Sequence, residues 1–133
     1  MIVYAYDDKQ GLVILESALR ELVGSNLIFH GFARTADLLT EARDSEYDVV
    51  FVNAEYCRNS ALFLLCELYR LYPRSNLIGV AEKGSVHDAL ILHRIHASDY
   101  IIKPYDMKYL YDSLKHLRFP IRDIDSQMKI ISA

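Results

Sequence analysis

The residues with the clearest chemical potential in this sequence follow short apolar runs. Asp7 and Asp8 come directly after IVYAY, Asn53 ends YDVVFVN, and Lys103 ends SDYIIK ahead of Pro104. Two adjacent carboxylates can hold a divalent cation. They can also cap a helix, whose N-terminal end favours negative charge, and pair with a lysine. The chemistry therefore depends on which elements bring these residues together.

Five apolar or β-branched runs have the length of strands: 2–6, 26–32, 47–53, 75–81 and 98–103. Between them, apolar residues recur at spacings of three and four, which is typical of helices. The clearest sets are Leu12, Leu15, Leu19 and Leu22, and Leu62, Leu65, Leu68 and Leu71. Strict alternation of strand and helix predicts an α/β fold with helices on both faces of a mostly parallel sheet.

Length and composition predict one domain. A chain of 133 residues that is 52% apolar can close one core but is too short for two ordinary domains. Its formal charge of −3 provides no electrostatic footprint for nucleic acid. No apolar run approaches the roughly 18 residues that a membrane span needs, and the acidic start MIVYAYDD is no signal peptide. We expect a soluble, cytoplasmic protein that contacts no membrane.

The cysteines and the histidines give little indication of a metal site. Cys57 and Cys66 form no CxxC pair, and Cys66, within ALFLLCEL, is expected to be a small core residue. His93 and His96 lie three residues apart, with His87 less than two turns earlier, so they could form a metal site. No cysteine or carboxylate accompanies them convincingly, and a solvated helix face is the favoured interpretation.

The carboxyl ends of parallel strands meet at one edge of the sheet, where open doubly wound sheets bind their ligands. We therefore expect that edge to gather the chemical residues of the chain: Asp7, Asp8, Asn53, Ala81 and Lys103. No GxGxxG or Walker pattern indicates a nucleotide enzyme, and no Ser/His/Asp or Cys/His set falls on this edge. The sequence favours a binding module over an enzyme.

This expected edge resembles that of the receiver domain in bacterial two-component response regulators. Receivers carry an acidic pair after strand one, as Asp7 and Asp8 do, and a Lys-Pro pair after strand five. They place an aromatic switch residue three positions before that lysine, where Tyr100 stands. The resemblance covers residues 1–118 and implies a flavodoxin-like (βα)5 fold with strand order 2-1-3-4-5.

The chain departs from receivers where phosphoryl chemistry is performed. Asn53 replaces the phosphoacceptor aspartate, and Ala81 replaces the Thr or Ser whose hydroxyl takes a phosphoryl oxygen. The following loop has Tyr56, Cys57 and Ala61 where receivers favour Met-Pro and a later Gly. Because an amide is no anionic nucleophile, the acyl-phosphate route is closed at Asn53. The resemblance thus implies a degenerate phosphorylation site at Asn53, Ala81 and Lys103.

Loss of the third carboxylate also weakens the expected cation site. One unit charge against a divalent ion is worth several kcal/mol at an effective dielectric of about 20. We expect no cofactor and no saturable Mg²⁺ binding at roughly millimolar concentration. Asp7 and Asp8 are thus a weak metal candidate, with capping and pairing to Lys103 as the favoured alternative.

A second hypothesis keeps some chemistry at this edge. Glu55 lies two residues past Asn53, so Glu55 or Asp8 could accept phosphate instead. A small anionic ligand could also bind near Lys103. The leading hypothesis remains a phosphorylation-independent module that acts by protein contact.

Aromatic residues near the fifth strand suggest where that contact occurs. Tyr105, Tyr109 and Tyr111 surround Leu110 and Leu114 on the predicted fifth helix, and such aromatics are typical of protein interfaces. In receivers the fourth helix, fifth strand and fifth helix form the output and dimer face. Tyr100 and Tyr105 could act there as switch and interface residues, or the tyrosines could merely cover a core formed by the leucines.

The last fifteen residues, 119–133, are expected to be a linker or the start of a downstream output domain. Pro120 blocks continuation of the preceding helix. The resemblance implies that such a domain is most often DNA-binding and regulates transcription in two-component or phosphorelay signalling. Nucleic acid would then be contacted through that domain and not through residues 1–118.

Overall fold

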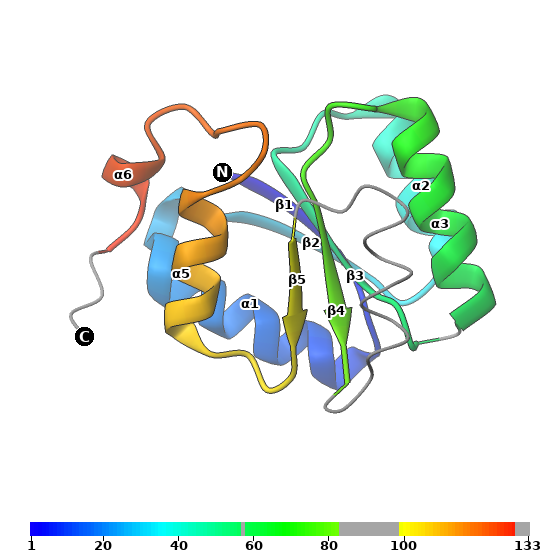
Figure 1. Cartoon of the computed structure of the whole chain (residues 1–133), viewed down its shortest axis with the longest axis horizontal. Coiled ribbons are helices and arrows are strands. Elements are labelled where there is room, and N and C mark those ends of the chain that lie inside the picture. The colour runs from blue at the N-terminus through cyan, green and yellow to red at the C-terminus, as the bar shows by residue number, and fades with distance from the viewer. Residues whose placement is uncertain (57, 83–98, 130–133) are drawn as a thin grey trace.

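The computed structural model describes residues 1–56, 58–82 and 99–129, which form a five-stranded sheet between helices (Figure 1). The strands are β1 (Ile2–Tyr6), β2 (Ile28–Phe32), β3 (Val49–Asn53), β4 (Leu77–Ala81) and β5 (Asp99–Ile102). All neighbouring pairs are parallel, in the order β2-β1-β3-β4-β5. This confirms the predicted α/β flavodoxin-like fold and its strand order.

Helices cover both faces of the sheet. The described helices are α1 (Lys9–Val23), α2 (Thr35–Asp44), α3 (Arg58–Leu71), α5 (Met107–Lys115) and the short α6 (Ile124–Gln127), with a 3₁₀ turn at Gly24–Asn26. In Figure 1, α1 and α5 lie on one side of the sheet, and α2 and α3 lie on the other. The predicted fourth helix, with His87, His93 and His96, lies outside the described residues. No helix in the described ranges is long and apolar enough to cross a membrane.

Alternating strand residues build two cores, because successive side chains of a strand point to opposite faces. Val3 and Phe51 pack with α1 and α5, whereas Tyr4 and Val52 pack with α2 and α3. The central strands β3 and β4 are buried at every residue, as expected when helices cover both faces. The edge strands β2 and β5 are more exposed.

The sequence determines where α1 begins and ends. The side chain of Asp8 caps the N-terminus by accepting a hydrogen bond from the Gly11 backbone N–H at 2.7 Å. The helix ends at Gly24, whose φ of 66° lies in the left-handed region that glycine adopts without strain. Between these ends, Leu15, Leu19 and Leu22 form the buried stripe that the spacing predicted.

Cys66 is exposed, so its assignment to the core was wrong. At about 100° per residue, α3 buries a different stripe: Ala61, Leu64, Leu65 and Leu68. Cys66 lies on the opposite side of the helix from this stripe. The apolar run ALFLLCEL did not reveal this difference, because both sides of the helix carry apolar side chains.

The segment after α5 packs back onto the domain. Buried Asn76 donates from Nδ2 to the carbonyls of Asp48 and Phe119, at 2.9 and 2.8 Å, and accepts from the Phe119 N–H at 3.0 Å. Further along, Met128 is only 6% exposed within the α1/α5 core, and the Lys129 N–H donates to the Leu22 carbonyl at 2.8 Å. The segment up to residue 129 therefore lies against the sheet domain, while a downstream domain stays a prediction.

We expect Asn76→Ala to lower the free energy of unfolding by about 2–3 kcal/mol, because it leaves backbone groups of Asp48 and Phe119 without their partner. Urea unfolding followed by circular dichroism measures the change. Asn59→Ala, at an exposed position of α3, is the control and should stay within about 0.5 kcal/mol. Equal effects of the two substitutions would contradict the assigned role of Asn76.

Candidate functional site

The carboxyl ends of β1, β3, β4 and β5 converge at one edge of the sheet, at the bottom of the view in Figure 1. The structure brings together there the residues that the sequence placed at this edge: Asp7, Asp8, Asn53, Ala81 and Lys103. The Lys103 N–H donates to the Ala81 carbonyl at 2.9 Å, which extends the ladder between β4 and β5 by one residue. The peptide bond from Lys103 to Pro104 is cis.

The Asp7 carboxylate, only 2% exposed, is the centre of this edge. Its Oδ1 accepts from the Asp8 N–H at 2.7 Å, from Asn53 Nδ2 at 2.8 Å and from Lys103 Nζ at 3.4 Å. Its Oδ2 pairs with Lys103 Nζ at 3.1 Å and accepts from the Tyr105 hydroxyl at 3.3 Å. A buried carboxylate is stable only when it is paired and hydrogen-bonded, and protein donors supply both here.

The Asn53 side chain is held in one orientation by its neighbours. Its Oδ1 accepts from the backbone N–H groups of Glu55 and Tyr56, at 2.9 and 3.2 Å. Its Nδ2 is therefore directed at Asp7, with Glu82 Oε1 as a more distant acceptor at 3.5 Å. An aspartate in this orientation would place an oxygen, not a donor, against the Asp7 carboxylate.

Lys103 supplies the positive charge of the network. Its Nζ lies between Asp7 and Glu82, at 3.1 Å from Oδ2 and 3.4 Å from Oε1. Burial lowers the pKa of Lys103, but its hydrogen bond and ion pair with Asp7 outweigh burial, and the net pKa is raised. Lys103 therefore stays charged at neutral pH and neutralises Asp7.

Tyr105 belongs to this network through its hydroxyl, and its predicted role at the partner face stays a prediction. Burial, together with the charge of Asp7, raises the pKa of Tyr105 well above its ordinary value. The hydroxyl therefore keeps its proton and remains a donor to Asp7. The position was recognised from the sequence, but nothing in the aromatic pattern indicated that its hydroxyl points inward.

Gly11 is a site residue that sequence reasoning missed. A Cβ at this position would lie 2.2 Å from Asp7 Oδ2, which no real pair of atoms tolerates. Only glycine allows the first turn of α1 to approach the carboxylate so closely. A glycine inside a predicted helix is the one sequence signal that could have indicated this approach.

Acidic side chains surround Lys103 at this edge. Glu55 Oε2 accepts from the Glu82 backbone N–H at 2.9 Å, and Asp8 carries the α1 cap. A cavity of about 470 Å³ lies beside them, lined by Asp8, Gln10, Gly11, Ile14, Glu82, Lys103, Pro104 and Tyr105. Fully buried Ala81 offers no hydroxyl to it. The charge here does not favour an anionic ligand.

The side chains do not fit a Mg²⁺ ion. Oxygen ligands are needed, yet Asn53 presents its NH₂ group to the centre and commits its oxygen to backbone donors. Both oxygens of Asp7 already accept from protein donors. Within the described ranges, no group of three or more His, Cys, Asp or Glu residues could hold a metal.

Of the three other tyrosines of the predicted contact face, Tyr111 is partly buried against the core, and Tyr100 and Tyr109 lie at the surface. Tyr100 is 45% exposed and Tyr109 is 68% exposed. Both line a groove of about 610 Å³ between β5 and α5, together with Asp99, Ile101, Ile102, Asp112, Ser113 and His116. Leu110 and Leu114 are buried, as the alternative interpretation of this helix predicted. Leu90, Ile91 and Ile95, which were placed beside this face, lie outside the described residues.

Solved structures share this fold. The chain is similar to a CheY-like response regulator receiver domain protein of Methanospirillum hungatei, at 19% identity and TM-score 0.73, over 95% of this chain and 94% of that chain. It is also similar to the N-terminal signal receiver domain of a two-component response regulator of Bacteroides fragilis, at 23% identity and TM-score 0.71, over 85% and 92%.

A third similar structure is NtrX of Brucella abortus, at 20% identity and TM-score 0.72. The match covers 82% of this chain and 25% of the NtrX chain. No protein-family model and no curated protein matches the chain. At these identities the structural likeness establishes the fold: the chain has the CheY-like receiver fold that its sequence resemblance implied.

We expect Gly11→Ala to destabilise the protein by about 2 kcal/mol, because the added methyl group collides with Asp7, as in other overpacked cores. Alanine normally stabilises a helix interior by about 1 kcal/mol relative to glycine, so the sign of the change is diagnostic. Urea unfolding measures it. In an Asp7→Ala background the same substitution should raise the free energy of unfolding. A decrease in that background would disprove the collision with Asp7.

Proposed function

We propose that the chain is a receiver-like signalling module that works by protein contact and is not phosphorylated. The fold supports a signalling role. One observation supports independence from phosphorylation. Asp7, whose oxygens a metal-dependent site would need as free ligands, is ion-paired with Lys103 and hydrogen-bonded by Asn53 and Tyr105. The edge is therefore complete without an added ion.

The chemistry of the side chains supports independence from phosphate. Asn53 has no anionic oxygen for attack on a phosphoryl donor, and its amide oxygen is held by two backbone N–H groups. Ala81 has no hydroxyl to read a phosphoryl group. We infer no catalytic role for any of these residues, and the module needs no cofactor.

The alternative is that the edge accepts phosphate at Glu55 or Asp8, or binds a small anion near Lys103. Asp8 and Glu55 both accept backbone hydrogen bonds, which a phosphorylated carboxylate would weaken. Lys103 is already paired with Asp7 and Glu82, so an anion would compete with two carboxylates. No contact among the residues that the structure describes favours this alternative, but it is directly testable.

The groove between β5 and α5 is the proposed site of protein contact. Tyr100, Ile102 and Tyr109 expose large apolar side chains along it, and aromatic residues are enriched where proteins meet. Either a protein partner or a second copy could bind there. Because this chain corresponds to a quarter of NtrX, we also propose that it works in the cytoplasm with an output domain, through which DNA is contacted.

The decisive substitution is Asn53→Asp. It replaces a hydrogen-bond donor with a second carboxylate beside Asp7. We therefore expect the free energy of unfolding, measured in EDTA, to fall by about 2 kcal/mol. Millimolar Mg²⁺ should then stabilise this variant, because three carboxylates can face the ion. The thermal midpoint of the natural protein should not respond to Mg²⁺. Scanning calorimetry with and without Mg²⁺ makes the comparison, and Asn59→Asp on exposed α3 serves as the control.

The same proteins should be incubated with a small phosphodonor and Mg²⁺, then weighed intact by mass spectrometry. We expect no phosphate adduct on the natural protein. A stoichiometric adduct would overturn the proposal, and its disappearance in Glu55→Gln or Asp8→Asn would identify the acceptor. Tight Mg²⁺ binding by the natural protein would equally contradict the proposed metal-free edge.

A further inference from the structure

β2 is an edge strand of the sheet, and part of its backbone faces away from the domain. The Ile28 N–H donates to the Met1 carbonyl at 2.8 Å, and the Phe32 carbonyl accepts from the Asp7 N–H at 3.3 Å, so both residues direct their backbone groups toward β1. Backbone groups alternate in direction along a strand. Those of Phe29 and Gly31 therefore point outward, where the described sheet has no further strand.

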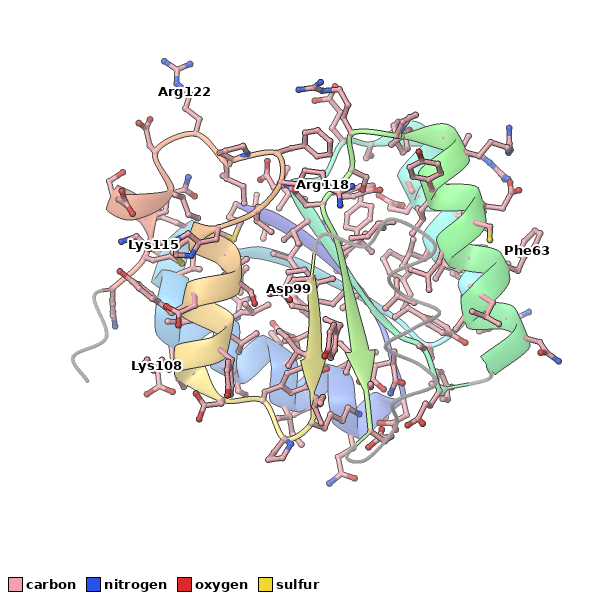
Figure 2. All side chains as sticks on the ribbon, in the orientation of Figure 1. Phe63, Asp99, Lys108, Lys115, Arg118 and Arg122 are labelled. Carbon is pink, nitrogen blue, oxygen red and sulfur yellow. The ribbon has the colours of Figure 1, made fainter. Side chains whose placement is uncertain are left out.

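The opposite edge of the sheet, at β5, is protected by a side chain. Asp99 lies at the start of β5 (Figure 2), and its Oδ1 accepts from the Tyr100 N–H at 2.8 Å. That N–H faces away from β4, because the Lys103 N–H, three residues further on, donates to the Ala81 carbonyl of β4. Charged side chains and proline commonly discourage the addition of a strand to an edge. The sequence of β2, IFHGF, contains neither, so its edge is open.

The side of α2 that overlooks β2 is acidic. The buried residues of α2 face the core, and at about 100° per residue its other residues divide between two sides. Arg43 lies toward α3, where its charge adds to the Arg70 hydrogen bond in lowering the pKa of Glu67. The opposite side, called the acidic side of α2 below, carries three carboxylates: Asp37, Glu41 and Asp44.

Glu41 provides independent evidence that this side of α2 lies near β2. Burial and, to a smaller extent, the charge of Glu41 raise the pKa of Tyr4. The Tyr4 ring packs edge-on against the His30 ring of β2, with 5.5 Å between the centroids. The acidic side of α2 is therefore close enough to β2 to attract a cationic side chain on an added strand.

The α1 side of the β2 edge is apolar. Phe29 packs against the α1/α5 core, and a Cβ at Gly31 would lie 3.2 Å from both terminal carbons of Leu12. Glu16 and Arg20, which share this side of α1, form an ion pair at 2.9 Å and add no net charge. The two faces of the β2 edge thus differ in character, with carboxylates toward α2 and apolar side chains toward α1.

We propose that the β2 edge binds an extended, cationic segment of a partner protein, which joins the five-stranded sheet as an added strand. The outward backbone groups of Phe29 and Gly31 require an extended chain as their partner. Side chains of a strand point alternately to its two faces. A segment that alternates basic and apolar residues would therefore pair with the acidic side of α2 and cover Leu12 and Phe29.

Charge complementarity favours such a segment over a second copy of this chain. A twofold pairing of β2 with its counterpart would bring two acidic sides of α2 together, and like charges so placed repel each other. The positive groups near β2 lie at its ends: Arg34 follows the strand, and the amino terminus donates to the Asn26 carbonyl at 2.8 Å. β2 and β5 are opposite edges of the sheet, so this inference stands apart from the proposed function.

Amide hydrogen exchange followed by NMR tests the added strand, with a short peptide that alternates lysine and valine as the probe. We expect saturating peptide to slow exchange at the N–H groups of Phe29 and Gly31. The Ile28 N–H, already bonded to Met1, should change little. A matched peptide with glutamate in place of lysine should bind several-fold more weakly. No binding of the lysine peptide, equal binding of both peptides, or binding without protection of Phe29 and Gly31 would overturn the proposal.

Two variants separate the acidic side of α2 from general attraction to an acidic protein. Asp44→Lys, at the last residue of α2, places a cation where a helix end favours one, so the variant should fold. We expect the lysine peptide to bind it several-fold more weakly than the natural protein. Glu21→Lys, at an exposed position of α1, makes the same change in net charge and should have little effect. Equal losses in the two variants would contradict the proposed site.

Light scattering on the natural protein without peptide tests the alternative occupant. We expect the mass of a single chain across the concentration range. A dimer whose Phe29 and Gly31 N–H groups exchange slowly would identify a second copy as the occupant of the β2 edge, and it would overturn the proposal.

Discussion

The buried Asp7 carboxylate is the constraint on which the carboxyl edge depends. Removing such a charge from water costs several kcal/mol unless good partners compensate for it. The compensation comes from the ends of two strands: Asn53 from β3, and Lys103 and Tyr105 from beyond β5. Gly11 then leaves room for the carboxylate beneath α1. The edge is thus held together by the requirement to neutralise one side chain.

Asn53 gains a specific meaning from this arrangement. In receivers an aspartate at this position and the acidic pair together hold a divalent cation. Here the amide performs part of the cation's electrostatic work, because its N–H donates to Asp7 while its oxygen accepts from the backbone. The substitution therefore supports the proposal of an edge that needs no metal ion. Ala81 is consistent with the proposed independence from phosphate, since it has no hydroxyl to contact a phosphoryl group.

The sequence correctly predicted the elements that follow from the periodicity of apolar residues. It failed for the positions of individual side chains that depend on packing. Alternation of strands and helices was sufficient for a parallel sheet and for the convergence of Asp7, Asn53 and Lys103 at one edge, whereas the strand order was implied by the resemblance to receivers. A glycine within the predicted helix was a signal of a close approach, but the partner of Gly11 was not predictable, because it depends on where an α1 turn lies relative to one carboxylate. Cys66 was misplaced because both sides of α3 are apolar. The inward hydroxyl of Tyr105 has no signature in sequence at all.

The carboxyl edge and the proposed contact groove are joined by a very short stretch of chain. Lys103 and Tyr105 form hydrogen bonds with Asp7. The next residue, Asp106, caps α5, because its side chain accepts from the N–H groups of Lys108 and Tyr109. Tyr109 in turn lines the groove. A partner that shifts the first turn of α5 must therefore pull on the donors of Asp7. In a metal-dependent receiver the same stretch would carry a signal outward from the edge. With Asp7 already paired with Lys103, the edge fixes the start of α5, and a partner bound in the proposed groove would act against that fixed point.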